Sequence, residues 1–312
     1  MTFQIISGSL EQGLVYGIMA LGVYLTFRVL NFADLTVDGS FPLGGAVAAA
    51  LIVSGAPPLL ATLAALLAGM LAGAVTGLLY TKLRIAGLLA GILTMTGLYS
   101  VNLRIMGRAN IPLLRQETLF TQLHDTFANI TYLDLLFFLL LALLIKLLLD
   151  AFLSTDFGMA MRATGDNPDM IRSLGVDTQA MVIAGLCLSN GLVALSGALV
   201  AQYQGFADAG MGIGTIVVGL ASVIIGTGII RPYTIFRATL GALLGAVIYR
   251  LAIFFALRMG LAPTDLRIMT AVLVIGALSA PTIKTIWAER VRMRRQAEEN
   301  AVLCRKGVGD NA

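Results

Sequence analysis

Charged side chains are scarce in this chain of 312 residues. Lysine, arginine, aspartate and glutamate make up 12% of it, against about 25% in an average soluble domain. Hydrophobic residues make up 58%, and the mean hydropathy is +0.90. The 21 basic and 17 acidic side chains are too few to cover the surface of a soluble protein of this size. The shortage excludes a soluble globular enzyme and a disordered protein, and it predicts a membrane protein.

Cysteine and histidine are scarcer still, with two and one residues. Cys187 lies in an apolar run and Cys304 in a polar tail, so they do not form the framework of a disulfide-stapled secreted domain. His124 stands alone, without a Cys or Glu cluster of metal-ligand spacing. No nucleophile–base pair and no glycine-rich phosphate loop ending in Lys-Ser/Thr occurs. We therefore expect no enzyme activity, no ATP site and no cofactor or metal in this chain.

The apolar runs are long and do not alternate, as between residues 135–149 and 211–230. Such runs are typical of membrane-spanning helices, since barrel strands are shorter and alternate. The sequence predicts an all-α polytopic transmembrane helix bundle of about 8–10 spans, with one broken or re-entrant helix. The nine apolar segments lie at residues 10–27, 41–53, 58–80, 85–106, 133–153, 181–201, 212–230, 235–257 and 266–283. The second is too short for an unbroken span, so we expect it to be the broken one.

Basic residues in short loops predict the orientation. We divide the chain into a transmembrane domain over residues 1–284, with a cytoplasmic loop at 154–178, and a basic cytoplasmic tail over 285–312. From residue 284 onward the chain holds a third of the basic residues, namely Lys284, Arg290, Arg292, Arg294, Arg295, Arg305 and Lys306. The side of the N-terminus stays open: it is outside if all nine segments cross, and inside if the second is re-entrant. Arg104, Lys146, Asp150 and Arg250 lie near span ends, where snorkelling explains them.

A polar stretch at residues 31–42 joins the first two segments and is the first candidate for a path or gate. It carries two carboxylates and ends in Gly-Ser-Phe-Pro. It is either a cavity-lining or gating element, or an ordinary turn in which Asp38 or Ser40 caps the following helix. Other polar residues within spans are path candidates too, although such side chains also join helices in lipid. The candidates are Asn31, Asp34, Thr36, Asp38, Gly39, Ser40, Thr96, Tyr99, Asn102 and Asn190.

The predicted cytoplasmic loop contains signals for a short helix. Asp166 or Asn167 can cap it, Pro168 suits its first position, and Gly175 ends it. The helix of about two turns would present Met170, Ile171 and Leu174. A solvated connector does not need a capped helix with apolar side chains, so we favour a docking element.

These residues resemble the permease subunits of bacterial ABC importers, in the branch that includes branched-chain amino acid and ribose permeases. The loop is similar to that branch's coupling segment, G-x-x-x-R-A-x-G-x-N-x-x-x-A-x-x-x-G-I. Ile171 departs from it by replacing the usual alanine. Asn31-Phe32-Ala33 also looks like the family's motif, but the following Asp34 to Ser40 is more similar to permeases for aromatic amino acids or poorly characterised solutes. The residues that the resemblance assigns to coupling with an ATPase are Arg162, Ala163, Gly165, Asp166, Asn167, Pro168, Asp169, Ile171, Leu174 and Gly175.

The resemblance implies a multi-pass permease subunit of the bacterial inner membrane that moves a small solute, an amino acid or a related compound, inward. Separate cytoplasmic ATPase subunits would hold ATP and Mg²⁺, an external solute-binding protein would deliver the solute, and a second permease copy would complete a homodimer. No nucleic-acid partner is expected. The alternative is a secondary transporter driven by an ion gradient, for which Glu11 and Asp34 are the best candidate relays.

Overall fold

A computed structural model describes residues 2–126, 132–230 and 232–258, together with isolated helical positions between 268 and 293. Residues Met1–Leu266 form one compact unit, and Arg267–Ala312 form a second. The expected span at 266–283 and the basic tail at 285–312 therefore lie largely outside the described residues. The described chain is helical apart from one small two-stranded ribbon, which confirms the all-α prediction.

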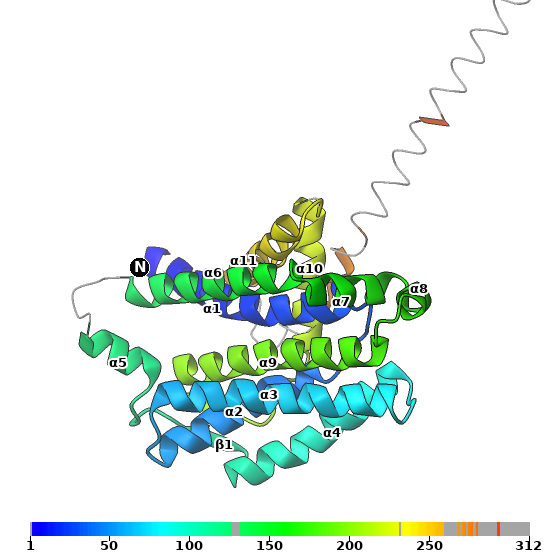
Figure 1. Ribbon diagram of the computed structural model, residues 1–312. Helices are drawn as coiled ribbons and strands as arrows, with labels where there is room; N and C mark the ends of the chain where they lie inside the picture. Colours follow the sequence, from blue (N-terminus) through cyan, green and yellow to red (C-terminus); the bar gives the residue numbers. More distant parts are fainter. Residues whose placement is uncertain are drawn as a thin grey trace, which may run out of the picture. The chain divides into compact units, whose positions relative to one another are not determined.

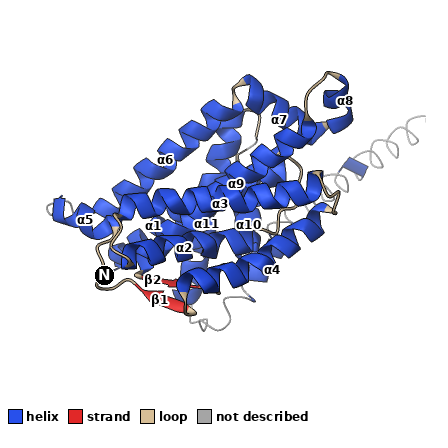
Figure 2. Cartoon of the chain, turned by 60° about the horizontal axis from the view of Figure 1, so that its bottom comes forward, coloured by secondary structure: helices blue, strands red, loops and turns tan. Residues whose placement is uncertain are grey.

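Six helices of the described chain are long and apolar enough to cross a membrane. They run side by side as a bundle (Figures 1 and 2), which confirms a polytopic membrane protein. The six are α1 (Thr2–Tyr24, continued by the π-helical turn η1, Leu25–Val29), α3 (Pro58–Thr81), α4 (Gly87–Met106), α6 (Leu133–Leu153), α9 (Thr178–Gln204) and α11 (Ile235–Arg258).

Glycines allow the central helices to touch closely. A Cβ atom at Gly69 or Gly73 of α3 would collide with the backbone of α9 at Asn190 and Leu186. In the same way, a Cβ at Gly245 of α11 would collide with the helix that carries Ser222. Without a hydrophobic driving force in lipid, helices associate through such close packing, so these small-residue spacings serve the bundle.

Two shorter apolar helices, α2 (Val37–Val53) and α10 (Thr215–Ile229), begin inside the bundle. Ser40, in the first turns of α2, bonds to Asn190 of α9. Asn190 is twelve residues beyond the first residue of α9, which is about 18 Å along the helix. The chain after η1 therefore turns back into the bundle before α2 starts at about half depth, as the short second segment predicted.

The second short helix, α10, was expected as a longer segment with a bend at the glycine run of residues 210–214. The sequence predicted a full span at 212–230, but Gly214 adopts a φ of +83° and α10 starts only at Thr215. Residues 211–214 instead fold back against the start of α2, where a Cβ at Gly212 would collide with Asp38 and Pro42. Glycine is needed here because the left-handed backbone and the close approach both exclude a side chain.

The two ends of the bundle carry different elements. The short helices α7 (Asp156–Asp166) and α8 (Pro168–Ser173) lie at the end where η1 stops, since Gly165 packs against the backbone of Val29. The opposite end carries the N-terminus, α5 (Leu119–Thr126) and the ribbon of β1 (Asn110–Pro112) with β2 (Phe206–Asp208) (Figure 1).

The N-terminus thus lies opposite the loop at 154–178. Of the two alternatives that the sequence left open, the structure agrees with the one that separates the N-terminus from this loop. The reason is that α2 does not return to the end it came from, because the stretch at 30–36 and α2 together traverse the bundle.

Candidate functional site

The starts of the two half-helices are joined by one carboxylate. Asp38, in the first turn of α2, accepts hydrogen bonds from the backbone N–H groups of Gly214 (3.0 Å) and Ile216 (2.7 Å) and from the Thr215 hydroxyl (3.0 Å). A carboxylate at a helix N-terminus satisfies free N–H groups and the positive end of the helix dipole. Asp38 is therefore a helix cap, as one of the two sequence readings held, but the helix it caps is α10 rather than its own.

A second polar network lies beside this junction. Asp34 is buried, and its carboxylate accepts from the Thr36 backbone (2.9 Å) and the Asn190 side-chain amide (2.7 Å). The Asn190 carbonyl in turn accepts from the Ser40 hydroxyl at 2.7 Å. The Thr36 hydroxyl bonds to that of Thr76 on α3 at 2.8 Å. The network joins α2, α3, α9 and the stretch that precedes α2, so in this conformation these side chains connect helices.

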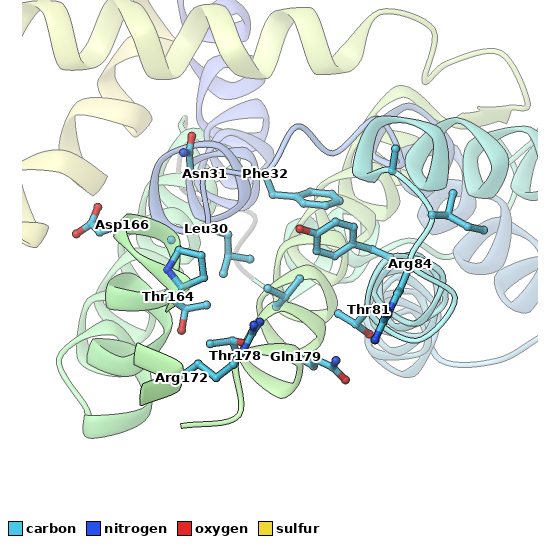
Figure 3. Close-up of a pocket in the computed structure, with 16 residues that line it drawn as sticks. Leu30, Asn31, Phe32, Thr81, Arg84, Thr164, Asp166, Arg172, Thr178 and Gln179 are labelled. Atoms are coloured by element: carbon cyan, nitrogen blue, oxygen red, sulfur yellow. The ribbon is translucent and has the colours of Figure 1, made fainter. Parts of the chain in front are cut away.

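The structure separates the remaining path candidates. Asn102 of α4 is fully buried, donates to the carbonyl of Gly39 at 3.3 Å, and has no hydrogen-bond partner for its own carbonyl oxygen within the described chain. Thr96 and Tyr99 are exposed on another part of α4, so they do not share the buried environment of Asn102. Asn31 lies apart from the network, on a pocket at the α7–α8 end (Figure 3).

The segment that the resemblance assigns to coupling forms the predicted capped helix. The Asn167 side chain accepts from the backbone of Met170 at 3.1 Å, Pro168 occupies the first turn of α8, and Gly175 ends it with a φ of +86°. Met170 and Leu174 are 54% and 68% exposed.

Ile171 corrects one expectation about that helix. It is only 6% exposed and packs inward, so it does not belong to the presented face. The cause is the helical period, which turns Ile171 about 100° away from Met170.

Of the other residues in this segment, Gly165 lies where α7 meets the bundle. Gly165 packs against the backbone of η1, so a side chain there would push α7 away. The exposed members of the set are Arg162, Asp166, Asn167, Pro168, Asp169, Leu174 and Gly175, with Ala163 partly buried.

Sequence reasoning missed an ion pair inside the bundle. Lys146 of α6 is 1% exposed, donates to Asp150 at 2.5 Å and lies over the ring of Phe236 at 3.1 Å. Asp150 also accepts from the Thr239 hydroxyl of α11 at 2.6 Å. The expectation that Lys146 snorkels to the membrane surface was wrong, because a partner lies one helical turn away. Opposite charges four residues apart on an apolar helix were the signal.

Two further polar contacts link α1 to later helices. Glu11 is buried and accepts from the Tyr203 hydroxyl of α9 at 2.6 Å. Arg250 of α11 places its guanidinium over the ring of Tyr16 at 3.7 Å, which a side chain snorkelling to the surface would not do. Among the described residues no group of three His, Cys, Asp or Glu side chains is arranged to hold a metal ion.

Comparisons with known proteins identify the family. The sequence model described as "Branched-chain amino acid transport system / permease component" matches residues 5–278. A tyrosine transport system permease protein of Clostridioides difficile is 44% identical over 86% of this chain and 89% of its own length. The more distant inner membrane ABC transporter permease protein YjfF of Escherichia coli is 28% identical over 83% of this chain and 84% of its own.

A solved structure shares the fold. A chain of PsaBC from Streptococcus pneumoniae, in complex with a Fab, superposes with a TM-score of 0.53 at 14% identity, over 89% of this chain and 95% of that one. Together with the helical bundle, these matches show that the chain is a multi-pass membrane protein of the branched-chain amino acid transport system permease family, the permease component of an ABC-type transport system.

Proposed function

We propose that this permease imports an aromatic or related amino acid using ATP hydrolysed on a separate subunit. The observation that carries the proposal is the capped helix α8, whose exposed Met170 and Leu174 stand at one end of the bundle. The similarity to a tyrosine permease supports the class of solute. It also favours ATP as the energy source over the ion-gradient alternative. Uptake of labelled L-tyrosine by cells that express the complete transporter tests the solute.

The α7–α8 end is the face proposed for the ATPase. Its apolar pair Met170 and Leu174 lies four residues apart and so shares one side of the helix. Gly165 holds α7 against η1, which continues α1. A push on α8 would therefore reach α1 directly, and through it the bundle. ATP and Mg²⁺ would stay on the partner subunit, in the cytoplasm.

Leu174→Glu should abolish binding of the ATPase subunit while the permease still folds. A charge replaces the most exposed apolar side chain of α8, and the expected loss of affinity is tenfold or more, because burying an unpaired charge is costly. Co-purification of the ATPase with the permease from membranes measures it. Leu114→Glu is the matched control, since Leu114 is also exposed but lies at the opposite end. Equal loss in both variants would contradict the docking assignment.

A second copy of the chain would cover the exposed face of α4, where polar side chains stand among apolar ones such as Leu93 and Val101. Thr96, Tyr99 and Ser100 are exposed there, within a helix that is apolar enough to span the membrane. Polar side chains at membrane depth face protein or a water-filled cavity rather than lipid. The exposed face of α6 is by contrast leucine-rich, at Leu140, Leu144, Leu147 and Leu148, as lipid contact requires. We therefore place the solute path along α4, between two permease copies.

Gly97→Cys should give a disulfide-linked dimer on oxidation. Gly97 lies on the exposed face of α4, and nothing lies within 4 Å of a Cβ atom added there, so the change is tolerated. The measurement is non-reducing electrophoresis in a background where Cys187 and Cys304 are replaced by serine. Leu148→Cys on α6 is the control and should stay monomeric. A monomer in the first case, or crosslinking through α6 alone, would place the second copy elsewhere.

A further inference from the structure

A pocket of about 830 Å³ opens at the α7–α8 end and is not part of the polar junction at the start of α2. Its volume lies in the range of small-molecule sites, about 300–1,000 Å³. Its walls come from the stretch after η1, the α3–α4 connection, the α7–α8 segment and the start of α9 (Figure 3). Three regions distant in sequence thus converge on one cavity, since the α7–α8 segment and the start of α9 follow one another in the chain.

The backbone has a positive φ at two places on this wall. Among the described residues, Asn31 (φ 51°) and Arg84 (φ 54°) alone have a positive φ without being glycine, and both line the pocket. Asparagine adopts this conformation readily after a helix end, whereas for arginine it is costly, and costly backbone conformations gather at ligand sites. At Arg84 a glycine would adopt this positive φ at lower energetic cost than arginine does.

One wall of the pocket is aromatic. The rings of Phe32 and Tyr80 meet edge to face with centroids 5.1 Å apart. Phe32 is held in place because Gly87 leaves room for its ring, where any side chain would collide. Tyr80 is partly exposed toward solvent. The pair offers an apolar, quadrupolar surface to a flat ring.

The polar groups of the pocket are of both signs. Arg84 has no hydrogen-bond or ion-pair partner in the described part of the chain. Arg172 bonds to the Thr178 hydroxyl at 3.2 Å, and its contact to Asp169 is long, 3.9 Å, and exposed. Asp166 also borders the pocket, but its carboxylate points away from Arg84 and Arg172 (Figure 3). Guanidinium groups bind carboxylates through two parallel hydrogen bonds.

The geometry points to a binding site for a free aromatic α-amino acid in this pocket, on the side of the membrane that carries α8. The ring lies against Phe32 and Tyr80, and the carboxylate binds Arg84 and Arg172. For the choice of solute, this inference rests on the proposed function. A ligand here bridges α8 and the α3–α4 connection, so imported solute would restrain the helix proposed to meet the ATPase.

Equilibrium binding of radiolabelled L-tyrosine to the full-length permease tests the site. Vesicles of phosphatidylcholine alone exclude anionic headgroups. We expect saturable binding that Arg84→Ala and Tyr80→Ala each weaken about tenfold or more, since a charge-assisted hydrogen bond or a ring contact is lost. Arg115→Ala, an exposed arginine at the other end, should bind as the unmodified protein does. Tyramine, which lacks the carboxylate, and L-leucine, which lacks the ring, should compete poorly.

Unchanged binding in both pocket variants would overturn the inference. So would competition by inorganic phosphate, or by vesicles that contain phosphatidylglycerol, as strong as that by L-tyrosine, since the site would then serve phosphate headgroups. The uptake assay separates this from the proposed function. If tyrosine uptake is normal and Arg84→Ala does not change tyrosine binding, only the binding site in the pocket is contradicted. If Arg84→Ala weakens tyrosine binding but the transporter does not take up tyrosine, only the proposed transported solute is contradicted.

Discussion

Asn190→Asp should lower the free energy of unfolding by about 3–5 kcal/mol, the range for an uncompensated charge in a protein interior. The new carboxylate would stand against Asp34, whose oxygen lies 2.7 Å from the Asn190 amide nitrogen. Neither side chain has access to solvent, so neither charge is screened. The amide bond to the carbonyl of Leu186 is lost as well. Thermal unfolding of the purified permease in detergent, followed by size-exclusion chromatography, measures the change.

Adding Asp34→Asn to Asn190→Asp should restore most of the free energy of unfolding that the single change removes. The pair then again consists of one carboxylate and one amide, with donor and acceptor exchanged, and Ser40 can still donate to residue 190. Asn167→Asp is the matched control, because Asn167 is exposed and aspartate caps a helix equally well. If Asn190→Asp is as stable as the unmodified chain, or if the second change brings no recovery, the network does not hold the helices together.

The bundle could be predicted from the sequence because the length of an apolar run indicates whether it can form a helix that spans the lipid. A helix that satisfies its own backbone needs about 20 apolar residues, and the chain shows such runs without alternation. Segment 41–53 was recognisable as a half-helix because it is too short. Segment 212–230 was not, because its apolar composition continues through Gly212 and Gly214, and only the tertiary contact with Asp38 shows where α10 begins.

The sequence predicted which residues belong to the site, but not which residues each of them contacts. Asp34, Asp38 and Asn190 stood out because polar groups in apolar surroundings are costly. Which helix Asp38 caps depends on a contact across 176 residues. Local capping rules apply to residues that are close in sequence, so they cannot predict such a contact. The prediction that Ile171 is exposed on α8 was wrong for a related reason. Which side of α8 is covered depends on how the helix lies on the bundle, and the local sequence does not contain that information.

Asp38→Ala should destabilise the permease by about 3 kcal/mol, because it leaves two backbone N–H groups at the start of α10 without their acceptor, while the Thr215 hydroxyl keeps only the carbonyl of Gly212. Loss of a local cap costs about 1 kcal/mol. Here the same carboxylate also ties α2 to α10, so its removal frees two half-helices from each other. The measurement is thermal unfolding together with uptake by the complete transporter, and we expect uptake to fall at least tenfold.

Asp177→Ala separates this long-range role from ordinary capping. Asp177 caps α9 from its own N-terminus by accepting from Gln179 (2.9 Å) and Ala180 (3.2 Å), and it is exposed. Its loss should cost about 1 kcal/mol and leave uptake unchanged. Asp38→Asn should fall between the two alanine variants, since an amide keeps one acceptor but turns a donor toward donors. If Asp38→Ala costs no more than Asp177→Ala, the half-helices are held together by packing of the small residues around Gly212, and the carboxylate is only a cap.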